Sequence, residues 1–479
     1  MSTAKPWLIS YPENVPHECP PNPHTSLIEV FEKSFQRYHQ KTALVNMGSS
    51  LTYAQLDERS RQFASYLQHE AGLKPGDRIA LQMPNIFQYP IAFVGALRAG
   101  LTVVNTNPLY TPREMEYQFK DSGAVAIVIV ANFAFNLEKV LAQTSIRTVI
   151  VTELGDQLGG LKKSLVNFVV RRVKKMVPPY QLKGAVSFND ALAQGAKKPY
   201  QKINHQREDV ILLQYTGGTT GLSKGAMLTN ANLTQHIEQF GSVFNTHIKE
   251  DDICIVPLPV YHITALFGLI FTLSRGLKDI MITNPRDIPA FVKELRKHPF
   301  TMFFGLNTLY NALLNHPDFS KVDFSHVKVC LAGGMAMQTV VSERWEKQTG
   351  VPILEGFGLS ETSPILTVNM VGKNRQGTVG LPIPGTEIMI ADEEGKPLPM
   401  GEAGEFCARG PQVFQGYWQK DNSQVFHPGG WFKTGDIAQM DEDGYFRIVD
   451  RKKDMILVSG FNVYPNEIEN VVASHPKVL

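Results

Sequence analysis

The sequence contains few cysteines, little net charge and no long apolar run, and each absence narrows the possible functions. The four cysteines lie far apart, at Cys19, Cys254, Cys330 and Cys407, so no CxxC or CxxH spacing offers a metal site. Disulfides are not expected, and a reducing, cytoplasmic location is the prediction. A net charge of +2 gives no overall attraction to nucleic acid, so we predict no nucleic-acid partner.

Membrane insertion is also not expected. No stretch of about 18 apolar residues is present to span a bilayer, and residues 1–7 lack the apolar segment of a secretory signal. Instead, 43% hydrophobic and 19% charged residues are typical of a globular protein with a large core. The length of 479 residues predicts roughly three domains.

Short β-rich runs alternate with helical patterns along most of the chain. A strand at 77–81 precedes a helix at 89–98, and a strand at 102–104 precedes a helix at 112–119. This order predicts an α/β protein with two doubly wound, mostly parallel sheets. Near residue 376, glycines and prolines become dense and the strands short, which predicts a small antiparallel β subdomain.

Four segments follow from these changes of texture. They are an N-terminal α/β subdomain (1–205), a second α/β subdomain (206–375), a small β subdomain (376–449), and a hinge with the start of a C-terminal α+β lid domain (450–479). The last segment offers only a strand and a helix, which cannot bury a core alone. We therefore expect a chain truncated within its lid.

The most informative segment is Tyr215-Thr-Gly-Gly-Thr-Thr-Gly-Leu-Ser-Lys-Gly225. It follows an apolar run at 210–213 that reads as a buried strand, and a helix-compatible segment at 230–240 comes after it. Glycines allow backbone N–H groups to approach phosphate, hydroxyls donate to phosphoryl oxygens, and Lys224 supplies a positive charge. It is not a Walker loop, because Gly225 follows the lysine. We predict a polyphosphate-binding loop rather than a flexible linker.

A basic amphipathic segment spans residues 161–177. Six Lys or Arg residues alternate with apolar residues at helical spacing. Such a helix suits the surface of an anionic membrane, whereas the alternative is a surface helix packed on its own core. Both interpretations stay open.

Further motifs follow the loop in a fixed order. They are Leu331-Ala-Gly-Gly334, Glu355-Gly-Phe-Gly-Leu-Ser-Glu-Thr362, Trp431-Phe-Lys-Thr-Gly-Asp436, and Asp450-Arg-Lys-Lys-Asp454 with Gly460-Phe-Asn462. With these motifs the whole chain resembles the adenylate-forming superfamily of acyl-CoA synthetases, firefly-type luciferases and peptide-synthetase adenylation domains. The run from Thr434 to Glu469 is most similar to bacterial long-chain fatty-acid–CoA ligases.

The resemblance implies a two-step reaction and a set of phosphate ligands. A carboxylate attacks the α-phosphorus of ATP, and the thiol of coenzyme A then displaces AMP. Glu361 is implied as the Mg²⁺ ligand and as catalytic, together with Lys224. The implied phosphate-binding residues are Thr216, Gly217, Gly218, Thr219, Thr220, Gly221, Lys224 and Ser360.

Adenine and ribose are assigned to later motifs by the same resemblance. The implied residues are Gly333, Gly334, Glu355, Gly356, Phe357, Gly358, Asp436 and Arg451. Phe357 stands where the superfamily commonly has tyrosine, so a face for stacking is kept and a hydroxyl is lost. A carboxylate such as Asp436 can accept from both hydroxyls of a diol.

The resemblance places His262 beside the acyl carboxylate as a catalytic group, although a lone histidine near an apolar segment is more often structural. Lys453 matches the hinge position, with a solvated charge run as the alternative. Gly460 and Phe461 are implied for coenzyme A. Candidates for the acyl pocket are Phe267, Phe303, Phe304 and Leu306, which could equally be core residues.

We thus expect an AMP-forming long-chain fatty-acid–CoA ligase whose substrates are a fatty acid, ATP and coenzyme A, with Mg²⁺ as cofactor. Because the superfamily's C-terminal lysine is absent, weak or no turnover is expected. The alternatives are a non-catalytic ATP- or acyl-binding protein, and an acyl-AMP ligase that serves a carrier protein. A homodimer, and peripheral contact with the inner face of the membrane through 161–177, are further hypotheses.

Overall fold

The computed structural model describes residues 5–217, 222–454, 456–458, 461–463, 465 and 472. Five predicted site residues therefore lie outside the described residues: Gly218, Thr219, Thr220, Gly221 and Gly460. The side chain of Phe461 also lies outside the description. Within the described residues no helix is long and apolar enough to cross a membrane.

A seven-stranded sheet forms one half of the molecule, with strand order β7-β6-β5-β3-β4-β8-β9. Its strands run parallel except for β9, which pairs antiparallel with β8. The bounds are β3 (Arg78–Gln82), β4 (Thr102–Asn105), β5 (Ala126–Val130), β6 (Thr148–Thr152), β7 (Val186–Ser187), β8 (Val210–Thr216) and β9 (Lys224–Thr229).

A nine-stranded sheet forms the other half, with order β16-β15-β14-β13-β12-β10-β11-β1-β2. Its central pairs are parallel, whereas β2, β15 and β16 join antiparallel at the edges. The bounds are β1 (Thr42–Asn46), β2 (Ser49–Thr52), β10 (Ile253–Val256), β11 (Lys278–Met281), β12 (Met302–Gly305), β13 (Val329–Ala332), β14 (Ile353–Phe357), β15 (Thr367–Val368) and β16 (Leu381–Pro382).

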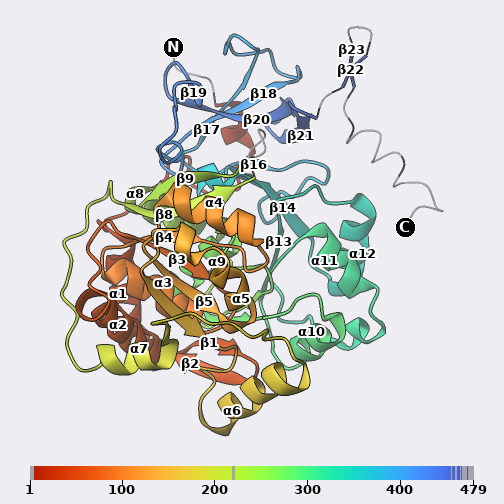
Figure 1. Ribbon diagram of the computed structural model, residues 1–479. Coiled ribbons are helices and arrows are strands. Elements are labelled where there is room, and N and C mark those ends of the chain that lie inside the picture. The colour runs from red at the N-terminus through yellow and green to blue at the C-terminus, as the bar shows by residue number, and fades with distance from the viewer. Residues whose placement is uncertain are drawn as a thin grey trace.

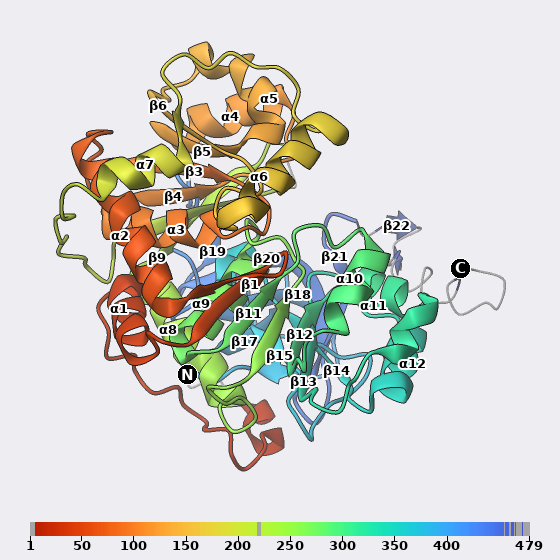
Figure 2. The same ribbon diagram turned by 90° about the horizontal axis from the view of Figure 1, so that it is seen from below.

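Helices cover both faces of both sheets (Figures 1 and 2). The bounds are α1 (Leu27–Arg37), α2 (Tyr53–His69), α3 (Gln88–Arg98), α4 (Pro112–Ser122), α5 (Ala134–Glu138), α6 (Gly160–Phe168), α7 (Phe188–Gly195), α8 (Asn230–Phe244), α9 (Ile263–Arg275), α10 (Ile288–Leu295), α11 (Asn307–Leu314) and α12 (Thr339–Thr349). Several begin at residues that the sequence marks, since Thr52 and Thr111 each form a capping box.

In the two large sheets, strand alternation divides the apolar side chains of the described residues among three clusters. In β10, Ile253 and Ile255 face a cluster formed with α10, α11 and α12, whereas Cys254 and Val256 face the central core. Successive side chains of a strand point to opposite faces, so a strand buried on both sides reads as a continuous apolar run. A third cluster places α4 and α5 on the outer face of the seven-stranded sheet.

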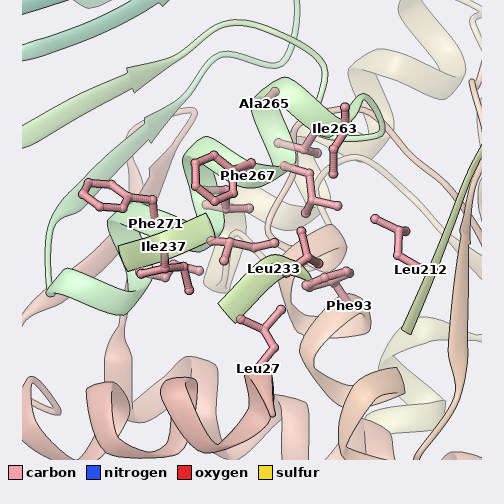
Figure 3. Packing of buried hydrophobic residues seen from close by; sticks show 14 of the residues in the cluster. Leu27, Phe93, Leu212, Leu233, Ile237, Ile263, Ala265, Phe267 and Phe271 are labelled. Atoms are coloured by element: carbon pink, nitrogen blue, oxygen red, sulfur yellow. The ribbon is translucent and has the colours of Figure 1, made fainter. Parts of the chain in front are cut away.

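The central core lies between the two sheets. Figure 3 shows Leu27 of α1, Phe93 of α3, Leu233 of α8 and Phe267 of α9 pointing toward one another, with Leu212 of β8 nearby. All five are at most 2% exposed. One shared helical layer therefore fixes the position of one sheet relative to the other, and with it the loops at the ends of their strands.

A small antiparallel sheet lies above these layers in Figure 1, as the texture of the sequence predicts. Its strands are β17 (Glu387–Ala391), β18 (Gly404–Arg409), β19 (Phe426–His427), β20 (Trp431–Met440) and β21 (Phe446–Arg451). β22 (Ile456–Val458) pairs with β23 (Phe461–Val463) as a separate hairpin. The α/β class with mostly parallel sheets is confirmed.

Two features differ from the expectations drawn from the sequence. The segment 161–177 is not one continuous α-helix, because α6 ends at Phe168 and a π-helical turn covers Val169–Val173. The large sheets also exchange strands across residue 205: β1 and β2 join the nine-stranded sheet, and β8 and β9 join the seven-stranded one. The four-segment division of the chain stays a prediction.

The outer core behind the nine-stranded sheet depends on Trp345. Its ring is fully buried and its centroid lies 4.6 Å from that of Tyr310 and 5.6 Å from that of Phe303. We predict that Trp345→Ala destabilises the protein by about 3–5 kcal/mol, because it leaves a large cavity. The urea midpoint measures this. Val340→Ala on the exposed face of the same helix should change the free energy of unfolding by less than about 0.5 kcal/mol. Equal shifts of the urea midpoint in the two variants would contradict the prediction.

Candidate active site

The glycine-rich loop connects two paired strands. Thr216 at the end of β8 pairs with Lys224 at the start of β9, so the loop closes a β-hairpin. The helix predicted at 230–240 is present as α8, which begins at Asn230, but the strand β9, which was not predicted, lies between the loop and that helix. The hairpin holds the Thr216 hydroxyl and the Lys224 ammonium at the two ends of one loop.

A buried carboxylate faces this hairpin. Glu361 lies in the short turn Ser360–Thr362 and is 5% exposed. Its Oε1 accepts a hydrogen bond of 2.6 Å from the Tyr417 hydroxyl, and the Thr216 hydroxyl lies 3.5 Å away. Its backbone carbonyl accepts from Phe414 N–H at 2.8 Å. A buried carboxylate is costly unless it is hydrogen-bonded, so these partners hold Glu361 in place.

Tyr417 is a site residue that the sequence did not reveal. Besides its bond to Glu361, its ring centroid lies 5.2 Å from the Lys224 ammonium, and its backbone bridges to Ala226 of β9. Burial raises the pKa of Tyr417 well above the ordinary value, and the Glu361 carboxylate raises it further, so the hydroxyl stays protonated. Tyr417 lies in a turn-rich region, and no local motif marks it.

A narrow cavity brings the predicted adenine segments next to the predicted acyl residues. Its lining includes Gly333, Gly334, Gly356, Phe357 and Gly358, together with Phe267 and Phe304. Glycine is required at 358, because an added Cβ would lie 1.7 Å from the carbonyl oxygen of Pro364. The volume of the cavity is about 50 Å³, which has room for only a few waters.

The other two acyl candidates lie elsewhere. Phe303 faces the opposite side of the nine-stranded sheet and packs with Tyr310 and Trp345, which takes it away from this cavity. The physical reason is the two-residue period of β12, which sends Phe303 and Phe304 to opposite faces. Leu306 does not line the cavity, but it approaches Gly334, where an added Cβ would lie 3.8 Å from Leu306 Cδ2.

Two predicted nucleotide ligands meet at the antiparallel sheet. Arg451 pairs with Asp436 across β20 and β21, and Arg451 Nε lies 3.6 Å from Asp436 Oδ1. Asp436 is buried whereas the Arg451 side chain is 59% exposed. Burial raises the pKa of Asp436 to about 6, against the opposing effect of Arg451, and the negative charge of Glu361 contributes to the rise.

Glu355 is a second carboxyl with a raised pKa. It is the third residue of β14, and its Oε1 accepts from Met337 N–H at 3.1 Å. Burial raises its pKa to about 7, although that hydrogen bond favours the charged form. Phe357 lies two residues further along β14, and its ring packs edge-on against Phe406 at 5.2 Å.

His262 directly precedes α9, and Lys453 follows β21. His262 is only partly open to solvent, and the groups packed around its imidazole lower its pKa by desolvation. A lowered pKa favours neutral imidazole at neutral pH. Lys453 is exposed just after β21, and its charge acts on Asp436. Within the described residues, no group of three or more His, Cys, Asp or Glu could hold a metal ion.

Comparison with known proteins agrees with this fold and these motifs. Residues 31–418 match the family described as AMP-binding enzyme. A long-chain-fatty-acid–CoA ligase of Yersinia pestis is 52% identical over 99% of this chain and 85% of its own, and one of Escherichia coli O6:H1 gives the same values. The crystal structure of ATP-bound MatB from Rhodopseudomonas palustris superposes with a TM-score of 0.80, at 28% identity over 94% of this chain and 84% of that chain.

The chain thus belongs to the AMP-binding enzyme family. It is an AMP-forming acyl-CoA synthetase by its family and its relatives. The comparisons give no support to the expectation of weak or no turnover, because 99% of the chain aligns with a curated ligase. This chain spans 85% of that relative's length.

The Tyr417 hydroxyl has a role that can be separated from its ring. We predict that Tyr417→Phe lowers kcat/KM for ATP by about 10- to 100-fold, since a hydrogen bond to a charged group contributes roughly 1.5–3 kcal/mol. Tyr445→Phe is the matched control, because its hydroxyl donates to Lys373 O at 2.9 Å. Pyrophosphate release with varied ATP measures both, and equal kinetics in the two variants would contradict this role for Tyr417.

Proposed function

We propose that the protein is a long-chain fatty-acid–CoA ligase that uses ATP to form an acyl-adenylate and then an acyl-CoA, with release of pyrophosphate and AMP. The observation that carries the proposal is the cavity shared by the glycines of β13–β14 and by Phe267 and Phe304. A nucleotide held by those glycines would lie next to the apolar side chains of Phe267 and Phe304. The names of the relatives supply the substrate class.

The nucleotide is held by three groups of residues. Thr216 and Lys224 bind the β- and γ-phosphates, where negative charge grows as pyrophosphate leaves. Ser360 donates to the α-phosphate from the turn that carries Glu361. Asp436 and Arg451 bind the ribose, and Phe357 stacks on the adenine.

Mg²⁺ fits the residues present. Glu361 contributes a carboxylate and Thr216 a hydroxyl oxygen within 3.5 Å of it. Mg²⁺ is commonly bound by one or two carboxylates with phosphate oxygens and water, and so needs no further protein ligand here. When bound, the ion would neutralise charge on the phosphates. Tyr417 holds Glu361 through its hydroxyl and leaves the second carboxylate oxygen for the ion.

The first step forms one bond and breaks another. A carboxylate oxygen of the fatty acid attacks the α-phosphorus, and the bond from that phosphorus to the bridging oxygen of pyrophosphate breaks. His262, whose lowered pKa favours the neutral imidazole, orients the attacking carboxylate. In the second step the sulfur of coenzyme A attacks the acyl carbon, its proton is lost, and AMP departs.

Two assignments complete the proposal. Lys453 is the hinge about which the following segment turns between the steps, and Gly460 and Phe461 receive coenzyme A. Both come from the resemblance of the Asp450–Asp454 and Gly460–Asn462 motifs. A cytoplasmic location and a homodimer stay predictions.

The proposal is tested by fatty-acid-dependent pyrophosphate release with Mg·ATP across acyl lengths. We expect turnover with long chains, and a loss of about 10²–10³ in kcat for Glu361→Gln, which keeps the shape but removes the charge. Glu346→Gln, an exposed residue of α12, is the control. If long-chain acids gave no pyrophosphate while another carboxylate did, the substrate class would be wrong.

The raised pKa of Asp436 leads to a prediction of how ATP binding depends on pH. Its carboxylate accepts from both ribose hydroxyls when it is charged and accepts more weakly when it is protonated; its pKa is about 6, so ATP affinity should fall as the pH drops from 7 to 5. We expect Asp436→Asn to bind ATP more weakly at pH 7 and to lose this part of the pH dependence. Calorimetric titration measures the ATP affinity of both proteins in the same buffers. Protonation of ATP itself affects both proteins equally, so it cancels in the comparison. Parallel pH curves would contradict the assignment.

A further inference from the structure

The helical segment Gly160–Val173 carries an outward-facing apolar stripe. Neither α6 nor the π-helical turn after it contains a buried residue. Leu161, Leu165 and Phe168 are 90%, 63% and 59% exposed. Spacings of four and three residues place them on one face of the helix. An exposed row of large apolar side chains of this kind marks an interaction surface.

The opposite face fixes the direction of the stripe. Val166 packs against the central core, and Asn167 Oδ1 accepts from Gly155 N–H at 2.8 Å. The Asn167 amide also donates to Asp156 Oδ1 at 3.0 Å, and Arg171 forms an ion pair with Glu153. With these contacts made, the stripe cannot turn inward to bury itself.

Positive charge surrounds the stripe. Between Gln157 and Asn189 the sequence contains seven Lys or Arg residues and no Asp or Glu. Arg172, Lys174 and Lys175 are exposed directly after the stripe, among the exposed side chains of Val173 and Met176. The whole chain has a net charge of only +2, so this charge is a local concentration.

We propose that residues 160–177 dock the protein onto the surface of an anionic lipid bilayer. The stripe enters the headgroup boundary while Arg172, Lys174 and Lys175 bind lipid phosphates, as an interfacial helix with a basic rim does. Charge complementarity favours lipid over a second copy of this chain, because a two-fold contact would place the same cations against each other. α6 lies at the lower edge of the molecule in Figure 1, with its outer face free to meet a plane.

Vesicle flotation of the full chain tests this docking surface. The probes are vesicles of phosphatidylcholine alone and with about one third phosphatidylglycerol. We expect recovery with the anionic vesicles only, and less of it as salt rises. Arg172→Gln/Lys174→Gln/Lys175→Gln should weaken the partition about 10²-fold, since each cation near such a surface contributes roughly a fivefold factor. Leu161→Ser/Leu165→Ser/Phe168→Ser should abolish recovery.

The control removes the same charge from elsewhere. Lys293→Gln/Lys347→Gln/Lys396→Gln alters three exposed lysines outside the segment and should float as the unaltered protein does. All these positions are exposed, so each variant should keep its urea midpoint. Recovery unchanged by the segment variants would overturn the proposal. The proposal would also be overturned if the unaltered protein did not float and instead formed a concentration-dependent dimer that the serine variant abolished.

Discussion

One buried carboxylate at the meeting point of three sheets constrains the whole arrangement. Glu361 follows β14 of the nine-stranded sheet, faces Thr216 of the seven-stranded sheet, and accepts from Tyr417, which precedes β19 and β20. A charge in that position is strongly destabilising without its partners. The turn that carries it can therefore be satisfied only when all three sheets are in place.

The shared helical layer makes that meeting possible. α8 and α9 contribute apolar side chains to one core with both large sheets, which fixes the distance and tilt between them. Close-packed interiors tolerate little displacement, so the ends of β8 and β14 are held in fixed positions relative to each other. Functional groups on short loops thus gain precision from the core beneath them, against which Tyr417 itself packs.

Much of this could be predicted from the sequence because local patterns carry it. Thr52 and Thr111 mark the starts of their helices, because each forms capping hydrogen bonds with a residue three positions further along the chain. Buried parallel strands such as β5 appear as unbroken apolar runs. The strand after the glycine loop was missed, since Lys224–Thr229 has no pattern of its own and forms through pairing with β8. Which sheet a strand joins, as with β1, is likewise decided by distant partners.

The site residues divide in the same way. Glu361, Asp436 and the glycines stand in contiguous motifs, whereas Tyr417 reaches Glu361 across 56 residues of chain and no motif announces it. Phe303 and Phe304 look equivalent in sequence, yet successive side chains of β12 point to opposite faces, which sends Phe303 to the outer core and Phe304 to the cavity. Which residue faces which side depends on the register of the strand, and the register is set by neighbouring strands.

The assigned hinge stands where the antiparallel ladder stops. β20 and β21 pair as far as Asp436 and Arg451, and Lys452 N–H still donates to Gly435 O at 2.9 Å. Lys453 is the next residue, and its side chain is exposed. A rotation after this point would break no ladder bond, whereas one inside β21 would break several. Because Arg451 precedes the proposed hinge at Lys453, Asp436 would keep Arg451 beside it during such a rotation, whereas Lys453 would move.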